Sequence, residues 1–257
     1  MTLQPTRCLC GAETVQPIGV KDERPVGRCV TCALVRTCGV PPDYEALYKE
    51  GDRYHSERPG HVHYRDRFEH DDEVAGQRWP RLMAHMRLLD VGCANGAFVR
   101  YAAAHGMEAE GLEPNPRMAA WAGQRCGRPV HGSWATVKGP FDIVTYHDVI
   151  EHILDPVEEL RRVRSFLRVG GMLVVDTPDA DDPRFARLGL AWHHMKPVEH
   201  MWFFTERHLR WLVARAGYVV LQIDRPIPGK IVLYGRVAAA EPIAGASPDS
   251  QTMLIFP

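Results

Sequence analysis

The densest group of side chains that could perform proton chemistry lies in the segment 191–209, AWHHMKPVEHMWFFTERHL. Glu199 directly precedes His200, and further histidines stand at His193, His194 and His208. Histidine titrates near neutral pH, so an imidazole beside a binding site can take a proton from a hydroxyl group or an enolisable carbon. We expect His200 to be such a base, oriented by Glu199. Alternatively, His200 hydrogen-bonds to backbone and closes its loop, while His208 is expected to be structural.

A second Glu-His pair occurs in the string YHDVIEHILDP, residues 146–156. Glu151 and His152 come directly after the β-rich run FDIVTYHDV, in which His147 and Asp148 stand near the end. Residues that follow a parallel strand border the ligand site of an α/β sheet. His152 is therefore a second candidate base, and the alternative is that it caps the following helix.

A glycine loop, LLDVGCANGAF, separates a strand-like run from a helix-like run at residues 88–98. Gly92 and Gly96 allow a sharp turn and close approach to a ligand, and the loop delivers amide groups at a helix N-terminus. Glu113 ends the next strand, in EPNP, where a carboxylate can accept hydrogen bonds from both ribose hydroxyls. The dinucleotide-binding spacing G-x-G-x-x-G is absent, which disfavours a nicotinamide dehydrogenase.

Five of the seven cysteines fall within the first 38 residues. Cys8 and Cys10 form a C-x-C pair, and Cys29 and Cys32 form a C-x₂-C pair. Four thiolates satisfy tetrahedral zinc, so these four are predicted to hold a structural Zn²⁺ ion. Cys38 could replace one ligand, and reduced free cysteines are the alternative. A four-cysteine site is coordinatively closed and would not itself catalyse.

Strand-like and helix-like patterns alternate around these motifs. The expected strands cover 87–92, 107–114, 129–133, 141–149, 172–179, 219–225 and 230–238, and the expected helices cover 97–106, 117–126, 156–171 and 205–218. Such alternation indicates βαβ units and an α/β fold with a doubly wound, largely parallel sheet. Ligands then bind at the carboxyl ends of the strands.

The composition limits the partners. Lys and Arg number 31 against 32 Asp and Glu, a formal net charge of −1, which disfavours nucleic-acid binding through phosphate neutralisation. No apolar run reaches the ~18 residues that suggest a membrane span, and the first residues lack the apolar core of a secretory signal. We expect a cytoplasmic monomer or homodimer that acts on a small molecule, without nucleic acid or membrane.

The order of the motifs resembles the class I S-adenosylmethionine (SAM)-dependent methyltransferases over about residues 85–220. Their glycine loop is an acidic residue followed by G-x-G-x-G, and here Ala94 takes the place of the middle glycine. The resemblance implies a Rossmann-like seven-stranded sheet and SAM as cofactor. It assigns cofactor contacts to Asp90, Gly92, Cys93, Gly96, Glu113, Pro114, His147, Asp148 and Glu151. The family usually has an acidic residue after its third strand, where this sequence has Trp134 instead, and we expect Trp134 to stack on the adenine.

Within that family, the string P-x-E-H-x-x-x-F-T at 197–205 resembles the deoxysugar C-methyltransferase branch, which also has an N-terminal zinc module. This resemblance implies catalytic roles for His200, Glu199, His152 and Tyr54. The D-x-x-E-H string also resembles ubiquinone-type O-methyltransferases, in which the equivalent residues can hold a divalent cation. Members of the deoxysugar branch are longer and have a further C-terminal domain, so shorter relatives that act on other metabolites fit equally well. The expected acceptor is therefore a sugar nucleotide or a natural-product intermediate.

We therefore predict four regions: a zinc module at 1–42, a Tyr- and His-rich lid and linker at 43–84, a methyltransferase core at 85–240 and a tail at 241–257. Two other functions stay open. An RNA base methyltransferase can also carry an N-terminal zinc finger, and the segment 161–168 is basic, although a solvated helix face explains it. A non-catalytic interaction module on the SAM-binding fold is the second.

Overall fold

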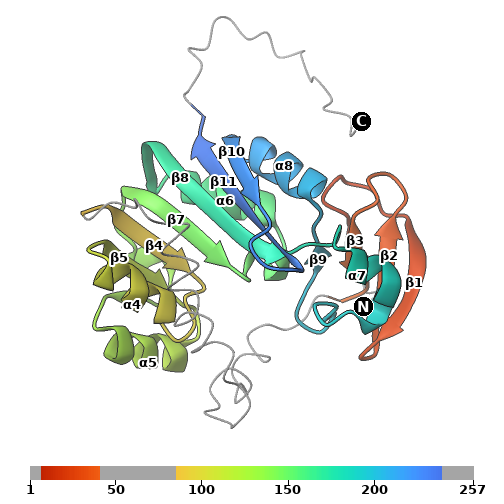
Figure 1. The fold of residues 1–257 in the computed structure, drawn as a ribbon, viewed down its shortest axis with the longest axis horizontal. Helices are drawn as coiled ribbons and strands as arrows, with labels where there is room; N and C mark the ends of the chain where they lie inside the picture. The colour runs from red at the N-terminus through yellow and green to blue at the C-terminus, as the bar shows by residue number, and fades with distance from the viewer. Residues whose placement is uncertain (1–6, 41–84, 239–257) are drawn as a thin grey trace, which may run out of the picture.

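The computed structural model describes residues 7–40 and 85–238 of the chain. The larger part is a twisted sheet with helices on both faces, and a small sheet formed mainly by the N-terminal residues lies at one end of it (Figure 1). Within the described residues, no helix is long and apolar enough to cross a membrane.

Seven strands form the central sheet, in the order β10-β11-β8-β7-β4-β5-β6. Strands β4 to β8 run parallel to one another, and β11 is antiparallel to both β8 and β10. The predicted doubly wound α/β fold is thereby confirmed. The strands are β4 (Arg87–Val91), β5 (Glu108–Leu112), β6 (Val130–His131), β7 (Phe141–His147), β8 (Leu167–Pro178), β10 (Tyr218–Asp224) and β11 (Lys230–Val237).

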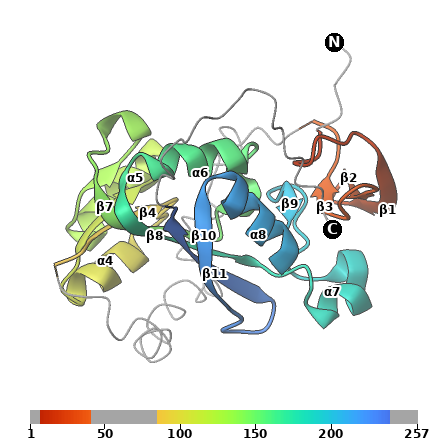
Figure 2. The same ribbon diagram turned by 90° about the horizontal axis from the view of Figure 1, so that it is seen from above.

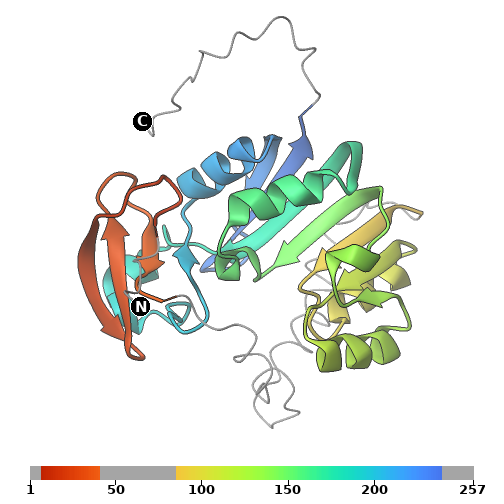
Figure 3. The ribbon, with the colours of Figure 1, turned by 180° about the vertical axis from the view of Figure 1, so that it is seen from behind.

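Alternating side chains of each strand point to opposite faces, and the two faces are covered by different helices. Leu88, Ile143 and Val174 pack with helix α4 (Ala97–Ala104) and the end of α5 (Pro116–Cys126). Their neighbours along the strands pack on the other face against α6 (Pro156–Arg164) and α8 (Glu206–Arg215), which lie next to one another in Figure 3.

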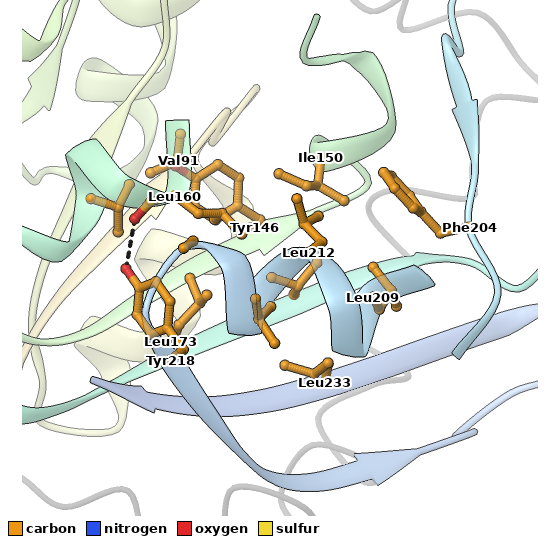
Figure 4. Packing of buried hydrophobic residues seen from close by; sticks show 14 of the residues in the cluster. Val91, Tyr146, Ile150, Leu160, Leu173, Phe204, Leu209, Leu212, Tyr218 and Leu233 are labelled. Atoms are coloured by element: carbon orange, nitrogen blue, oxygen red, sulfur yellow. Dashed lines mark hydrogen bonds between the residues drawn. The ribbon is translucent and has the colours of Figure 1, made fainter. Parts of the chain in front are cut away.

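The face under α6 and α8 holds the larger core. Leu209 and Leu212 of α8 pack over the sheet beside Leu173 and Leu233, as Figure 4 shows. The hydroxyl of Tyr218 in β10 donates a 2.9 Å hydrogen bond to the backbone carbonyl of Leu160 in α6. A polar group at the edge of this core is thus paired, as burial requires.

Residue types typical of helix ends begin and end these helices. Asn115 caps α5 by accepting hydrogen bonds from the amides of Arg117 and Met118, and Pro116 occupies the first helical position. Gly127 ends the same helix with a positive φ. Asp155 caps α6 by accepting from the amide of Glu158 at 3.0 Å.

The expected helix at 156–171 is wrong in its second half. Helix α6 ends at Arg164, and β8 already begins at Leu167, which pairs with Phe141. The amide of Phe141 donates to the carbonyl of Phe166 at 2.7 Å, so sheet pairing takes over from the helix here. The apolar residues Phe166 and Leu167 fit either period, and Gly170 adopts a positive φ within the strand rather than a helix end.

The small sheet has the order β1-β2-β3-β9, formed by β1 (Val15–Lys21), β2 (Arg24–Cys29), β3 (Val35–Thr37) and β9 (Trp202–Phe203). Its fourth strand therefore comes from a segment far along the chain, and it begins two residues after His200. Helix α7 (Pro183–Leu188) lies beside this sheet in Figures 1 and 2. Val26 and Val35 pack there with Phe185 and Trp192.

Candidate functional site

The glycine loop connects the end of β4 to the start of α4, as expected. Asp90 is buried in β4, and its Oδ1 accepts a 2.7 Å hydrogen bond from the hydroxyl of Thr145 in β7. Burial raises the pKa of Asp90 to about 6, opposed by the charge of His147 and by the Thr145 hydrogen bond. Gly92 and Gly96 both have positive φ, and a side chain at Gly92 would collide with Val149.

Most amides of this loop are already paired within the fold. The amides of Gly92 and Cys93 donate to the carbonyl of Leu112, and that of Gly96 donates to the carbonyl of Cys93. The amide of Ala94 donates to Glu113 Oε2 at 3.1 Å. The loop amides therefore maintain the loop's own shape, in addition to any contact they make with a ligand. The Cys93 side chain is buried and packs where a Cβ on Gly111 would lie.

Glu113 follows β5 and joins two turns. Its Oε2 accepts from Ala94, and its Oε1 accepts from the amide of Asn115 at 2.9 Å. Each carboxylate oxygen can accept a further hydrogen bond, so a ribose fits this position. Burial raises the pKa of Glu113, although these two amides oppose the effect. The neighbouring Pro114 is exposed in the same turn.

Trp134 occupies a short 3₁₀ turn after β6. Its ring packs against Phe166, with centroids 5.0 Å apart, at the margin of the larger core. This contact gives Trp134 a structural partner from the turn between α6 and β8. The contact lends no support to the predicted stacking on adenine.

Four charged or titratable residues meet where β7, β8 and β11 come together. Lys230 of β11 is buried and forms salt bridges with Asp148 and with Asp176, the latter at 2.9 Å. Asp176 Oδ2 also lies 3.6 Å from His147 Nδ1. Burial opposes ionisation of His147, but its contact with Asp176 and nearby carboxylates raise its pKa overall. His147 Nε2 is buried and has no hydrogen-bond partner among the described residues.

Glu151 lies in the turn after β7 and is almost fully buried. Its Oε2 accepts a 2.9 Å hydrogen bond from the hydroxyl of Thr177 in β8, and its Oε1 has no partner among the described residues. Burial and the charge of Asp148 raise the pKa of Glu151 to about 8, opposed by Lys230. A protonated Glu151 can therefore donate as well as accept a hydrogen bond near neutral pH.

The two Glu-His pairs come together, although they are distant in the sequence. The rings of His152 and His200 are 4.8 Å apart between centroids and nearly perpendicular. His200 is buried, and its Nδ1 has no hydrogen-bond partner among the described residues. Burial, together with the charge of His152, lowers the pKa of His200 well below its ordinary value. A neutral His200 can accept a proton.

Glu199 acts on the other histidine of the pair. Burial lowers the pKa of His152, and the charge of Glu199 is the largest effect opposing it. The amides of Glu199 and His200 both donate to the carbonyl of Lys196, at 2.9 and 2.7 Å, which closes a tight turn before β9. Glu199 was expected to orient His200, its neighbour in the sequence. In the structure, Glu199 also interacts electrostatically with His152.

Ligand atoms of Glu151, His152 and His200 lie within 4.8 Å of one another, so this group could also hold a metal ion. The cysteine group is the second such arrangement in the described part of the chain. Cys8, Cys10, Cys29 and Cys32 bring their Sγ atoms within 4.8 Å of one another.

The geometry of the four cysteines suits zinc. The separations Cys8–Cys32 and Cys10–Cys29 are 3.5 and 3.6 Å between Sγ atoms, and no disulfide joins them. A tetrahedral ion with Zn–S bonds of ~2.3 Å requires Sγ atoms about 3.8 Å apart. Cys38 is not in this group, and its Sγ lies 3.8 Å from the carbonyl of Arg36.

His208 has a structural role in α8. Its Nδ1 lies 2.7 Å from the Thr205 hydroxyl, and its Nε2 lies 3.0 Å from the carbonyl of Cys32. Tyr54, which was predicted to be catalytic, lies outside the described residues. The predicted lid and linker at 43–84 and the predicted tail at 241–257 also lie outside them.

Three residues of the site were not predicted from the sequence. Lys230 looked like the first residue of a late strand, Asp176 like a polar position near a strand end, and Thr177 like its neighbour. Position at the carboxyl end of β8 was a signal for Asp176 and Thr177, because that end borders the ligand site. Lys230 begins an antiparallel strand, so only the pairing of β11 with β8 brings it there.

The chain is similar to known methyltransferases in sequence. The methyltransferase domain family matches residues 60–223. The ubiquinone biosynthesis O-methyltransferase of Cereibacter sphaeroides is 29% identical over 147 residues, which are 51% of this chain and 60% of that protein. The chain thus spans about three fifths of the length of this curated relative.

Solved structures share the fold. The 1,6-didemethyltoxoflavin-N1-methyltransferase of Burkholderia thailandensis, solved with 1,6-didemethyltoxoflavin and S-adenosylhomocysteine, has a TM-score of 0.56 and 16% identity, covering 87% of this chain and 100% of that one. The magnesium protoporphyrin IX methyltransferase of Synechocystis, solved with S-adenosylhomocysteine, has a TM-score of 0.55 and 14% identity, covering 75% and 94%.

Proposed function

The chain belongs to the methyltransferase domain family, and from this we propose that it transfers a methyl group from SAM to a small-molecule acceptor, with His200 as the general base. The observation that carries the proposal is the meeting of the buried His200 with the half-buried His152 beside the ends of β7 and β8. Two elements distant in sequence thereby present two neutral imidazoles at the ligand edge of the sheet.

We propose that SAM binds across the ends of β4 and β5. Asp90 and the glycine loop lie at the end of β4, and Glu113 at the end of β5 can accept hydrogen bonds from a ribose. SAM supplies an electrophilic methyl group on a sulfonium. His147, whose buried Nε2 has no partner among the described residues, lies against Phe98 of α4 and borders the same site.

The residues of this chain would then orient the acceptor and remove its proton. A neutral His200 accepts a proton from a hydroxyl group or an enolisable carbon as the methyl group is transferred in line. A charged His152 would repel the imidazolium that forms on His200. Burial lowers the pKa of His152, which favours its neutral form and avoids this repulsion. Glu151 and its free Oε1 can fix a polar group of the acceptor.

The acceptor class follows from the polar character of this site. Glu151 and His152 lie beside the candidate base, and the ion pairs of Lys230 with Asp148 and Asp176 lie at the same edge of the sheet. A hydroxylated small molecule therefore fits this site better than an apolar one. We propose a sugar nucleotide or a natural-product intermediate. The similarity to an O-methyltransferase of ubiquinone biosynthesis supports a small molecule as well. The four cysteines would hold a structural Zn²⁺ ion, because their Sγ separations fit its tetrahedral geometry.

The test separates cofactor binding from proton removal. His200→Ala is expected to bind S-adenosylhomocysteine as the unmodified protein does, because the glycine loop and Glu113 are intact. Its rate of methyl transfer to the acceptor is expected to fall by roughly 10²–10⁴-fold, the usual contribution of a general base. Calorimetry measures the first quantity, and methyl transfer from labelled SAM to a panel of sugar nucleotides and hydroxylated metabolites measures the second.

His193→Ala is the matched control, because His193 is an exposed histidine of the same segment. Its turnover should stay close to that of the unmodified protein. Unchanged turnover in His200→Ala would exclude His200 as the base. Absence of S-adenosylhomocysteine binding by the unmodified protein would contradict the proposed function itself.

A further inference from the structure

The cysteine-containing sheet is joined directly to the segment that carries His200. Strand β3 pairs with β9, with Val35 opposite Phe203 and Arg36 opposite Trp202. The pairing continues at Thr37, whose amide donates to the carbonyl of Met201 at 3.0 Å. The Thr37 hydroxyl then donates to the carbonyl of His200 at 2.7 Å. The last polar contact of β3 is therefore made with the backbone carbonyl of the candidate base.

The opposite side of this segment is held by the other Glu-His turn. The amide of Met201 donates to the carbonyl of Glu151 at 2.9 Å, and the indole nitrogen of Trp202 donates to the carbonyl of Ile153 at 2.8 Å. The residues directly after His200 thus lie between β3 and the turn that carries His152. This arrangement fixes the backbone on which the two imidazoles face each other.

The His200 ring itself has little polar anchoring. Its Nδ1 forms no hydrogen bond with any described residue, and the rings of His152 and Phe203 lie beside it. The position of the ring must therefore be set mainly by its backbone and by packing. Thr37 is fully buried, so its hydrogen bond to the His200 carbonyl is shielded from water and has no competing solvent partner.

We propose that Thr37 is a positioning residue for His200, and that β3 orients the general base from the cysteine-containing sheet by completing its pairing with β9. The inference rests on the proposed function, because it assigns a purpose to the position of His200. Thr37 does not touch the acceptor or SAM. It acts through the peptide carbonyl of His200, which it holds at the end of the β3–β9 ladder.

Thr37→Val tests the hydroxyl with little change of shape. Its turnover number is expected to fall roughly 10- to 100-fold, because a displacement of about 1 Å in a catalytic group can cost 10²-fold. The acceptor KM and the S-adenosylhomocysteine affinity should change less than threefold. Thr37→Ser retains the donor and should recover most of the turnover. Thr14→Val, at an exposed threonine of the same part of the chain, is the matched control.

A merely structural role would produce a different pattern. If Thr37 only stabilises the fold, Thr37→Val lowers the unfolding temperature and zinc content, and the folded fraction keeps its turnover number. If Thr37→Val does not fold, Thr37→Ser and Thr37→Ala are compared instead, and equal turnover numbers in these two variants would overturn the proposal.

A double-mutant cycle with His200→Ala separates this inference from the proposed function. If Thr37 acts through His200, Thr37→Val has no further effect on turnover in the His200→Ala background, so the two losses are strongly non-additive. Multiplicative losses would overturn the positioning role and leave His200 as the base. Normal turnover of His200→Ala alone would overturn the base assignment, and the positioning role with it.

Discussion

Three buried polar atoms, at the end of β7, in the turn after it and in the turn before β9, have no partner among the described residues. They are His147 Nε2, Glu151 Oε1 and His200 Nδ1. A buried polar atom without a hydrogen bond costs about 1–3 kcal/mol, so folded proteins rarely retain one without a use. Three such atoms from neighbouring loops indicate a site that receives a polar ligand, which then supplies the missing partners.

Glu151 should make the stability of the protein depend on pH. Its pKa rises from the ordinary 4.5 to about 8 on folding, so between these values the folded state holds the proton that the unfolded state releases. The contribution to stability is complete below pH 4.5 and is lost as pH rises through 8. The free energy of unfolding should therefore fall by about 1.4 kcal/mol per pH unit from this group alone.

Glu151→Gln should remove that part of the slope, because glutamine does not titrate. Urea unfolding at several values between pH 5 and 8 measures the difference between the two proteins. Glu158→Gln, at an exposed carboxylate of α6, is the control and should leave the slope unchanged. Parallel curves for Glu151→Gln and the unmodified protein would contradict the raised pKa.

At the scale of elements, the glycine loop shows how strand, turn and helix combine. Ala94 replaces the middle glycine of the family pattern and adopts a φ of 45°, in the left-handed region. Its amide nevertheless donates to Glu113, so the turn links the ends of β4 and β5. The backbone conformation here is the one that glycine adopts most easily.

Ala94→Gly should therefore stabilise the protein. The left-handed conformation costs a non-glycine residue roughly 1–2 kcal/mol, and the greater freedom of glycine in the unfolded chain offsets about 0.5–1 kcal/mol of this. The expected net gain is up to about 1.5 kcal/mol, measured by chemical unfolding, with S-adenosylhomocysteine affinity retained. Ala102→Gly, the same change inside α4, should instead destabilise by about 1 kcal/mol or more. Equal losses in both variants would contradict this account of Ala94.

The alternation of strands and helices was predictable because each element carries its own hydrophobic period. The glycine loop, Glu113 and both Glu-His pairs were found for the same reason, since each follows a recognisable strand or precedes a helix. The end of α6 was not predictable, because Phe166 and Leu167 suit a helix or a strand and pairing with β7 decides. Strand β9 has only two residues, and Lys230 reaches the site only through the register of β11 against β8.

At the scale of the whole molecule, the cysteine group belongs to the same apolar core as the central sheet. Cys8, Cys29 and Cys32 pack in one continuous apolar cluster with Trp202 and Phe204, which flank the candidate site in sequence. The carbonyl of Cys32 also lies 3.0 Å from His208 of α8. Loss of the cysteine contacts should therefore destabilise β9 and α8 more than it destabilises the glycine loop.

Zinc removal should loosen this end of the molecule selectively. Cys32→Ser is expected to abolish stoichiometric zinc, because it removes one of four tetrahedral ligands, and binding of a structural zinc ion is part of the folding free energy. Hydrogen exchange should then accelerate over residues 15–37 and 200–209. Strands β4, β5 and β7 should remain protected, and S-adenosylhomocysteine should still bind while methyl transfer is lost.

Cys38→Ser is the matched control, because Cys38 lies in the same part of the chain but outside the group of four. It should keep zinc, protection and turnover. Zinc loss in Cys38→Ser would show that the ligand set is wrong. Zinc loss in Cys32→Ser with unchanged protection over residues 200–209 would show that the cysteine group is not coupled to the segment of His200. The coupling is expected because β3 and β9 share a hydrogen-bonded ladder, so β9 cannot keep its partner when β3 unfolds.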